Sequence, residues 1–244
     1  YEISACLVGS EMCIRDRAAA VKLGKEVIAA YADYEQLVGG VDTLFKDSSQ
    51  QLQTYAANAY KTAGLSANDY METVTGFSAS LIQSLGGDTE KAVKYADMAI
   101  TDMSDNANKM GTDMSSIQNA YQGFAKQNYT MLDNLKLGYG GTKQEMERLL
   151  ADAEKISGVK YDISSYADVV EAIHVMQESM DIAGTTAKEA EATISGSVNA
   201  LKSAVSNLIV GFGDADADME LLCNNMVDAF KTVVANITPV IENI

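Results

Sequence analysis

Asp97–Leu150 reads DMAITDMSDNANKMGTDMSSIQNAYQGFAKQNYTMLDNLKLGYGGTKQEMERLL, a stretch in which helical patterns alternate with breaks. Apolar residues recur every three or four positions from just before this stretch to its first break, and they share one helical face: Ala92, Tyr95, Ala99, Met103, Ala107 and Met110. Gly111 ends that pattern, because a residue without a Cβ readily adopts the left-handed conformation that closes many helices. Thr112 or Asp113 then offers a side-chain oxygen that caps the next helix. The stretch therefore predicts consecutive short helices.

A second boundary is the glycine-rich loop Gly138–Gly141, which is too flexible for regular structure. Thr142 and Glu145 follow it as a capping box, in which each side chain satisfies a backbone donor of the first turn. Similar caps and breaks recur along the chain, and they predict about nine helices within these limits: 18–38, 48–63, 66–85, 88–110, 113–137, 142–157, 164–180, 186–211 and 218–244. Three of these limits are set by pairs of residues. Gly39 and Gly40 are predicted to end the first helix, and two capping boxes, Ser48 with Gln51 and Thr186 with Glu189, are predicted to begin the helices 48–63 and 186–211.

Composition favours an all-α, multi-helical fold without a sheet. Among the 244 residues there is one proline and no tryptophan, and runs of β-branched residues are short. The formal net charge of −16 repels phosphate backbones and so argues against specific nucleic-acid binding. No apolar tract approaches the length of a membrane span, so we expect membrane contact only through regions outside this sequence. Breaks every two or three dozen residues also argue against one continuous coiled coil.

We divide the chain into a segment 1–17, an N-terminal helical region 18–87, a central helical domain 88–213 and the start of a C-terminal helical region, 214–244. The first segment, YEISACLVGSEMCIRDR, fits nothing that follows, and its string CLVGSEMCIRD resembles translated sequencing-adapter read-through. We expect it to be non-native, in which case Cys6 and Cys13 carry no function; a frayed N-terminal segment is the alternative. The chain begins without methionine and stops within an apolar pattern, so we interpret it as a fragment.

Whole phrases of the chain resemble the tail tape measure proteins of long-tailed bacteriophages and prophages, in their helical region. The longest phrase is NAYQGFAKQNYTMLDNLKLGYGGTKQEMERLLADAEK, from Asn119 to Lys155. Three more occur in the order expected for that family: YEQLVGGVDTLF (34–45), TGFSASLIQSLGGDTEKA (75–92) and GTTAKEAEATISGSVNALKSAVSNLIVGFGD (184–214). The resemblance runs from about residue 34 to the C-terminus.

This resemblance implies a structural function. A tape measure protein sets tail length during assembly and occupies the lumen of the tail tube in the virion, after synthesis in the bacterial cytoplasm. The implied partners are the tail tube protein, tail assembly chaperones, baseplate or tail-tip proteins and other copies of the chain. The resemblance carries over no catalytic residue and no cofactor. A helical interaction domain of a bacterial surface or secreted protein is the alternative, and a cell-wall hydrolase would need a carboxylate pair or zinc ligands that we do not find.

The strongest metal-like pattern is Asp214, Asp216 and Asp218, which resembles the start of an EF-hand loop. The pattern then fails, because Met219 stands where the sharp turn needs glycine and Asn225 where the bidentate glutamate belongs. We therefore expect an acidic loop whose last aspartate caps a helix.

Other candidates have ordinary structural interpretations. Gly138–Lys143 lacks the spacing of a phosphate loop, and no strand precedes it. His174, the only histidine, has no partner in the sequence around it for catalysis or zinc, so we expect it at the edge of the core. We expect Cys223 to be a small core residue. Five methionines favour core filling over a plastic binding surface: Met98, Met103, Met110, Met114 and Met131. We predict no catalytic, cofactor-binding or metal-binding residue.

Overall fold

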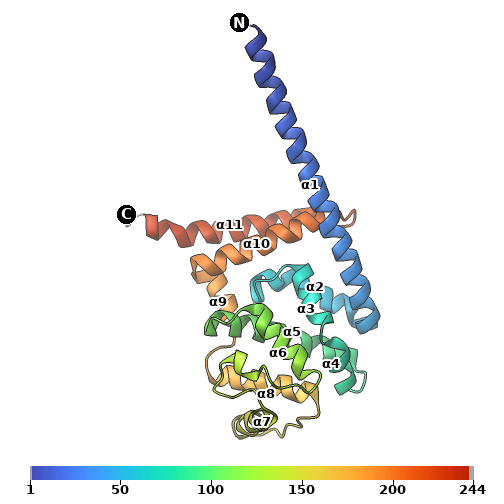
Figure 1. Ribbon diagram of the computed structural model, residues 1–244, viewed down its shortest axis with the longest axis vertical. Helices are drawn as coiled ribbons and strands as arrows, with labels where there is room; N and C mark the ends of the chain where they lie inside the picture. The colour runs from blue at the N-terminus through green and yellow to red at the C-terminus, as the bar shows by residue number, and fades with distance from the viewer. Residues whose placement is uncertain (1, 242–244) are drawn as a thin grey trace.

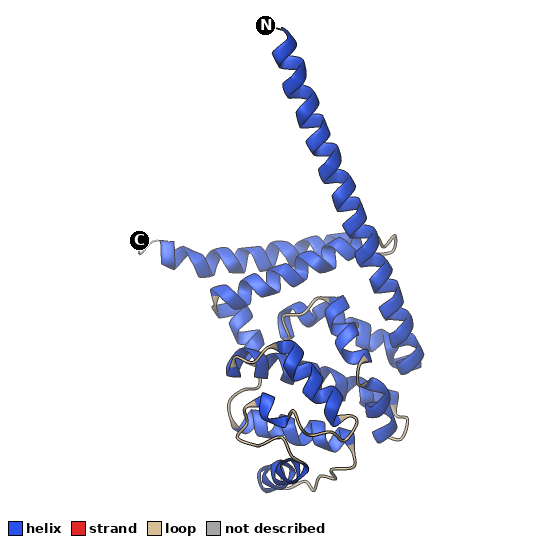
Figure 2. Cartoon of the chain, in the orientation of Figure 1, coloured by secondary structure: helices blue, strands red, loops and turns tan. Residues whose placement is uncertain are grey.

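The computed structural model describes the backbone of residues 2–241 and the side chains of residues 22–241. Throughout that range it contains helices joined by turns and loops, and no strand (Figure 2). The predicted all-α fold is confirmed.

The helices follow one another along the chain with short connections. The first half comprises α1 (Glu2–Phe45), the 3-10 turn η1 (Lys46–Ser48), α2 (Ser49–Thr62), α3 (Ala67–Thr75), α4 (Ser78–Ser84) and α5 (Thr89–Met110). The second half comprises α6 (Met114–Phe124), the 3-10 turn η2 (Leu132–Leu135), α7 (Lys143–Ser157), α8 (Tyr166–Ser179), α9 (Thr185–Ala192), α10 (Ile194–Gly211) and α11 (Met219–Ile241).

Three parts are visible in Figure 1: an arm, a body and a hairpin. The arm is the N-terminal part of α1, which projects away from the other helices, while the C-terminal part of α1 packs against α2, α3 and α10. The body consists of that C-terminal part and of α2 to α8. Helix α9 leads from the body to the hairpin, in which α10 and α11 lie side by side and run in opposite directions.

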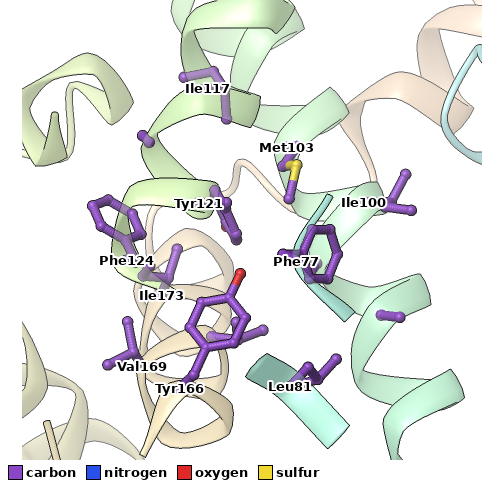
Figure 3. Close-up of a cluster of buried hydrophobic side chains, with 14 of the residues drawn as sticks. Phe77, Leu81, Ile100, Met103, Ile117, Tyr121, Phe124, Tyr166, Val169 and Ile173 are labelled. Atoms are coloured by element: carbon purple, nitrogen blue, oxygen red, sulfur yellow. The ribbon is translucent and has the colours of Figure 1, made fainter. Parts of the chain in front are cut away.

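One continuous hydrophobic core holds the body together. It extends from Val41 in α1 to Ile182 after α8, and so takes side chains from both the 18–87 and the 88–213 regions. Figure 3 shows the part where α4, α5, α6 and α8 meet: Phe77, Leu81, Ile100, Met103, Ile117, Tyr121, Phe124, Tyr166, Val169 and Ile173. These side chains lie on single helical faces, as three- and four-residue spacing requires.

Six predicted helix starts are confirmed by single hydrogen bonds. Their N-cap side chains accept a backbone N–H of the first turn: Ser66, Asp88, Asp113, Thr142, Ser165 and Asp218. The predicted helix 113–137 is shorter than expected, since α6 ends at Phe124 and the 3-10 turn η2 follows after a loop. Gly111 and Gly158 close α5 and α7 in the left-handed region, with φ of 64° and 74°. Glu145 differs from a standard capping box, since its carboxylate accepts the N–H of Gly140 rather than that of Thr142.

The predicted break at Gly39 and Gly40 is wrong, because α1 continues through both glycines to Phe45. Each glycine costs a helix about 1 kcal/mol relative to alanine. Val41 and Phe45 lie beyond them and are fully buried, so their packing outweighs that cost. The backbone of residues 2–17 belongs to the same helix, while Cys6 and Cys13 lie outside the described side chains.

The predicted helix 66–85 is two helices, α3 and α4. The chain bends at Gly76, where a Cβ would lie 2.6 Å from the Gln122 side chain of α6. This close approach lets Phe77 enter the core, where its ring lies edge-on to Tyr166 with 6.1 Å between centroids. The Ser48–Gln51 capping box is also wrong, since the Ser48 hydroxyl bonds to Thr89 instead.

The predicted helix 186–211 is likewise divided, into α9 and α10. Thr193 ends α9 and caps α10 by accepting the N–H of Gly196 (3.0 Å). A Cβ at Gly196 would overlap the backbone of Glu189, so the sharp bend between the two helices requires glycine there. The Thr186–Glu189 capping box is wrong, because α9 begins at Thr185 and Gly184 is its N-cap. The Thr186 hydroxyl accepts the Asn108 amide of α5 instead.

Candidate interaction surface

The acidic loop Asp214–Asp218 has the structural function that its sequence favours. The Asp214 carboxylate accepts the N–H of Asp216 (3.0 Å), and the Asp218 carboxylate accepts the N–H of Leu221 (2.9 Å) at the start of α11. Over the part of the chain with described side chains, no three His, Cys, Asp or Glu residues are grouped so as to hold a metal ion.

The loop Gly138–Lys143 joins η2 to α7, and its polar groups are used internally. The Arg148 guanidinium donates to the carbonyl of Gly138 (2.8 Å) and lies 4.5 Å from the centre of the Tyr139 ring. The Tyr139 hydroxyl donates to Asp152 (2.9 Å). Burial of the phenol, together with this hydrogen bond, raises the pKa of Tyr139 to about 12. This loop is an interhelical connection, as the sequence indicates.

His174 lies at the edge of the core, as predicted, but it has a partner that the sequence did not reveal. Its Nδ1 lies 2.9 and 3.0 Å from the two carboxylate oxygens of Asp102, whose side chain is only 2% exposed. Burial raises the pKa of Asp102 to about 6, and the hydrogen bond to Asp102 raises the pKa of His174. Nε2 lies 3.4 Å from Glu178. The pair joins α5 to α8 across 72 residues of sequence.

A second buried carboxylate on α5, Asp105, organises the turn between α8 and α9. It is fully buried and accepts the backbone N–H groups of Gly184 (2.6 Å) and Thr186 (2.7 Å). Carboxylates are rarely fully buried without partners, because desolvation of the charge is expensive. Spacing could have placed both aspartates on one helix, but it could not identify partners about 80 residues away.

An open cleft of about 640 Å³ lies between α1, α3 and α10. Its polar groups include Asn68, whose amide donates to the carbonyl of Ala30 (3.1 Å), and Asp69, which accepts the Ser66 hydroxyl (2.6 Å). Both bonds stabilise helix ends or helix contacts.

Three- and four-residue spacing in the sequence predicts one apolar stripe over the region of α9 and α10, from Ala190 to Leu208, but this stripe is not the face of α10 that is buried against the body. Its members are partly or substantially exposed, apart from Ala190, which belongs to α9: Ile194, Val198, Leu201, Val205 and Leu208. Small and polar residues occupy the buried face instead, among them Ser203 and Asn207. Asn207 accepts the N–H of Ala67 (2.8 Å) and Ser203 donates to the carbonyl of Gly64 (2.8 Å). The free ends of α2 and α3 need polar partners, and this requirement selects the face of α10.

Helix α11 carries two apolar stripes that start one residue apart. The inner stripe contacts α10 and includes Leu222, Met226, Ala229 and Val233, although only Ala229 and Val233 are buried. The outer stripe, which we call the α11 stripe, consists of Cys223, Val227, Phe230, Val234, Ile237 and Ile241. Because successive residues of a helix are about 100° apart, the two stripes are separated by about a quarter of a turn.

The α11 stripe is substantially exposed: Phe230 is 54% exposed, Val234 47% and Val227 41%. Cys223 is exposed too, so its prediction as a core residue is wrong. Among the fifteen large hydrophobic side chains that are exposed in residues 22–241, nine lie in α10, α11 and their connection: Ile194, Val205, Phe212, Leu221, Val227, Phe230, Val234, Val240 and Ile241. Concentrated apolar exposure of this kind marks interaction sites on folded proteins.

Four of the five methionines that were predicted to fill the core lie in it or against it. Met103 is fully buried, while Met98, Met110 and Met114 pack against the core from its edge, and Met131 is 42% exposed. Ile156 in α7 and Met180, which follows α8, are 54% and 39% exposed.

Comparison of the chain with known protein families, with curated proteins and with solved structures finds no match. Among the described helices, none combines the length and apolar content that a membrane crossing requires.

Proposed function

We propose that this chain is a segment of a phage tail tape measure protein, a structural component of the tail. The observation that carries the proposal is the ordered resemblance of four phrases, the longest at Asn119–Lys155, to that family. The all-α architecture is compatible with it, because helices satisfy their backbone polar groups locally.

On this proposal the chain occupies the tail tube of the virion and is made in the host cytoplasm. Its partners are the tube protein, assembly chaperones, baseplate or tail-tip proteins and other copies of itself. It acts as an assembly component and not as an enzyme, and it uses no cofactor. The exposed apolar side chains of α10 and α11 are the described surface best suited to such partners.

Deletion of Met98–Leu150 in the parent phage tests the proposal. This deletion removes most of α5, all of α6 and half of α7, and so removes a large part of the body core. Tail assembly should fail or be strongly impaired, as seen by electron microscopy. Normal tails in normal number would contradict a structural function. Intact tails shortened by about 1.5 Å per deleted residue would keep the tape measure function but show that this stretch acts as ruler.

A helical interaction domain of a bacterial surface or secreted protein is the second candidate, and the apolar surface of α10 and α11 is the observation that also fits it. The complete reading frame and its neighbours distinguish the two. Tube and baseplate genes beside it favour the tail, while a signal peptide or anchor upstream favours the surface or secreted protein.

A further inference from the structure

The α10–α11 hairpin rests on the body through an interface that is separate from the body core. Neither the buried side chains of that core nor the partly buried ones packed against it come from α9, α10 or α11. At the interface, Tyr60 of α2 forms a small cluster of its own with Ala204 of α10 and Ala229 of α11. Because alanine has little apolar area to bury, hydrophobic packing holds the hairpin on the body less firmly than it holds the body together.

Hydrogen bonds supplement this cluster. Asn207 accepts the N–H of Ala67, and Ser203 donates to the carbonyl of Gly64, each at 2.8 Å. The Tyr60 hydroxyl is buried in the same interface and has no hydrogen-bond partner among the described residues. A buried polar group without a partner is unfavourable, so the closed position of the hairpin leaves part of the interface unsatisfied.

Open clefts lie along α10 where it meets the body. One of about 640 Å³ separates α10 from α1 and α3, and another of about 400 Å³ lies between α2, α9, α10 and α11. A third, of about 150 Å³, lies where the start of α10 approaches α5 and α9. Protein interiors are close-packed, and atoms that line a cleft lack part of their dispersion contacts. The hairpin therefore rests on the body without closing against it completely.

The chain has a hinge position at the base of the hairpin. Thr193 alone separates α9 from α10, and its backbone is extended, with φ −120° and ψ 152°. Helix α9 is fixed to the body, since Asp105 of α5 accepts the N–H of Thr186 (2.7 Å). Asn236 of α11 donates to the Thr193 carbonyl (3.1 Å), and this bond lies beside the pivot, where a rotation moves atoms least. One junction residue between an anchored helix and a movable pair can absorb such a rotation.

We propose that the hairpin is a hinged flap, in which α10 and α11 swing away from the body as one unit about Thr193 while the body stays folded. The two helices move together because α10 packs most extensively against α11. Opening uncovers Tyr60, the N–H of Ala67 at the start of α3 and the carbonyl of Gly64 after α2. The inference rests on the geometry of the interface and is independent of the proposed function.

Thiol labelling of the full chain tests the opening. With the three native cysteines replaced by serine, Ala204→Cys places one thiol in the hairpin–body interface, and Ala99→Cys makes the same change in the body core. The exposed fractions of the two alanines are 2% and 0%. Under native conditions the thiol at position 204 should react roughly tenfold faster or more, because the hairpin opens more often than the body unfolds. Equal rates would refute the proposal.

Val233→Cys in the same cysteine-free chain distinguishes opening from unfolding of the hairpin. Val233 is 7% exposed and lies on the stripe of α11 that contacts α10, so α10 still covers it when the hairpin swings as a unit. Its thiol should therefore react more slowly than the thiol at position 204. Equal reaction at positions 204 and 233, faster than at position 99, would show that the hairpin unfolds in place and would contradict the flap.

The unaltered chain offers a second measurement, which stands even if a cysteine variant fails to fold. The buried N–H of Ala67 is bonded to a side-chain oxygen of the hairpin, while the buried N–H of Thr186 is bonded to a side-chain oxygen within the body. Amide exchange followed by NMR, corrected for intrinsic rates, should be roughly tenfold faster or more at Ala67. Equal exchange at the two amides would overturn the proposal.

Discussion

The body and the α10–α11 hairpin have equally regular apolar spacing, but they bury it to very different extents. In α5 the side chains of Ala92, Val93, Ala99, Ile100 and Met103 are fully buried. In α11, a helix of similar length, only Ala229 and Val233 are buried. The difference arises because α5 is surrounded by other helices, whereas the described chain places a neighbour on one stripe of α11 only. Amphipathic spacing therefore predicts a helix and its faces, but it does not predict which face is covered.

Two phenylalanines provide the most direct test of this comparison. Phe124 on α6 is 1% exposed and Phe230 on α11 is 54% exposed. Phe124→Ala should lower the free energy of unfolding by about 3–5 kcal/mol, because it removes buried area and leaves a cavity. Phe230→Ala should change it by no more than about 0.5 kcal/mol at a concentration where the chain is monomeric. Urea unfolding followed by circular dichroism measures both, and equal losses would show that the two regions do not differ.

Substitution of the buried Asp105 should have the next largest effect on the free energy of unfolding. Asp105→Ala leaves the buried N–H groups of Gly184 and Thr186 without an acceptor, so we expect a loss of roughly 3 kcal/mol. Asp105→Asn keeps one acceptor oxygen and should cost less than the alanine substitution. Urea unfolding of the three proteins gives the ranking. An alanine variant as stable as the parent would show that these N–H groups find other partners.

The attachment of the hairpin to the body depends on Asn207. Asn207→Ala removes the acceptor for the buried N–H of Ala67 and should cost about 1–2 kcal/mol. Amide hydrogen exchange should accelerate in α10 and α11 while α5 stays protected, because the hairpin can then open without the body. Asn199→Ala, at an exposed position on the same helix, is the control and should leave exchange unchanged. Equal acceleration in α5 would mean that hairpin and body unfold as one unit.

The Asp102–His174 pair should make the stability of the body depend on pH. The pKa of His174 is raised by folding from 6.5, so its protonation stabilises the fold fully below pH 6.5 and that contribution disappears as pH rises through the folded-state pKa. Asp102, whose pKa is raised to about 6, acts in the same direction at lower pH. Glu171, Glu178 and Asp105 are the nearby acidic groups.

Urea unfolding at several pH values should therefore give a free energy of unfolding that falls with rising pH above 6.5. His174→Gln keeps a hydrogen-bond donor but cannot be protonated, so it should remove this slope. A slope that persists unchanged in the variant would assign the pH dependence to other groups.

Deletion of Tyr1–Arg17 should have the smallest effect. The first large apolar side chains described in the arm, Leu23 and Ile28, are 51% and 71% exposed, so this part of α1 lies away from the core. We expect an unchanged melting temperature. Truncation through Phe45 also removes Val41, and since both side chains are fully buried it should be strongly destabilising. A clear loss of stability in the shorter deletion would show that the arm packs natively.

Helix ends were the most predictable feature of the chain. Ser66, Asp88, Asp113, Thr142 and Ser165 each cap the helix expected from the sequence. Their hydrogen bonds span two or three residues, so the information is local. The candidate surface was less predictable. Spacing identifies apolar positions on the last helix without showing which of them are covered, and the expectation that Cys223 lies in the core was wrong.

The sequence by itself determined that this chain is helical and where most helices begin and end, because those signals act between residues at most four positions apart. Only the tertiary structure decided that α1 continues through Gly39 and Gly40, since packing of Val41 and Phe45 outweighs the local cost. It also decided which groups meet across the body, such as Asp102 and His174, and which stripe of α11 remains exposed. These outcomes depend on the summed packing and hydrogen bonding of residues far apart in sequence, and no local pattern contains that sum.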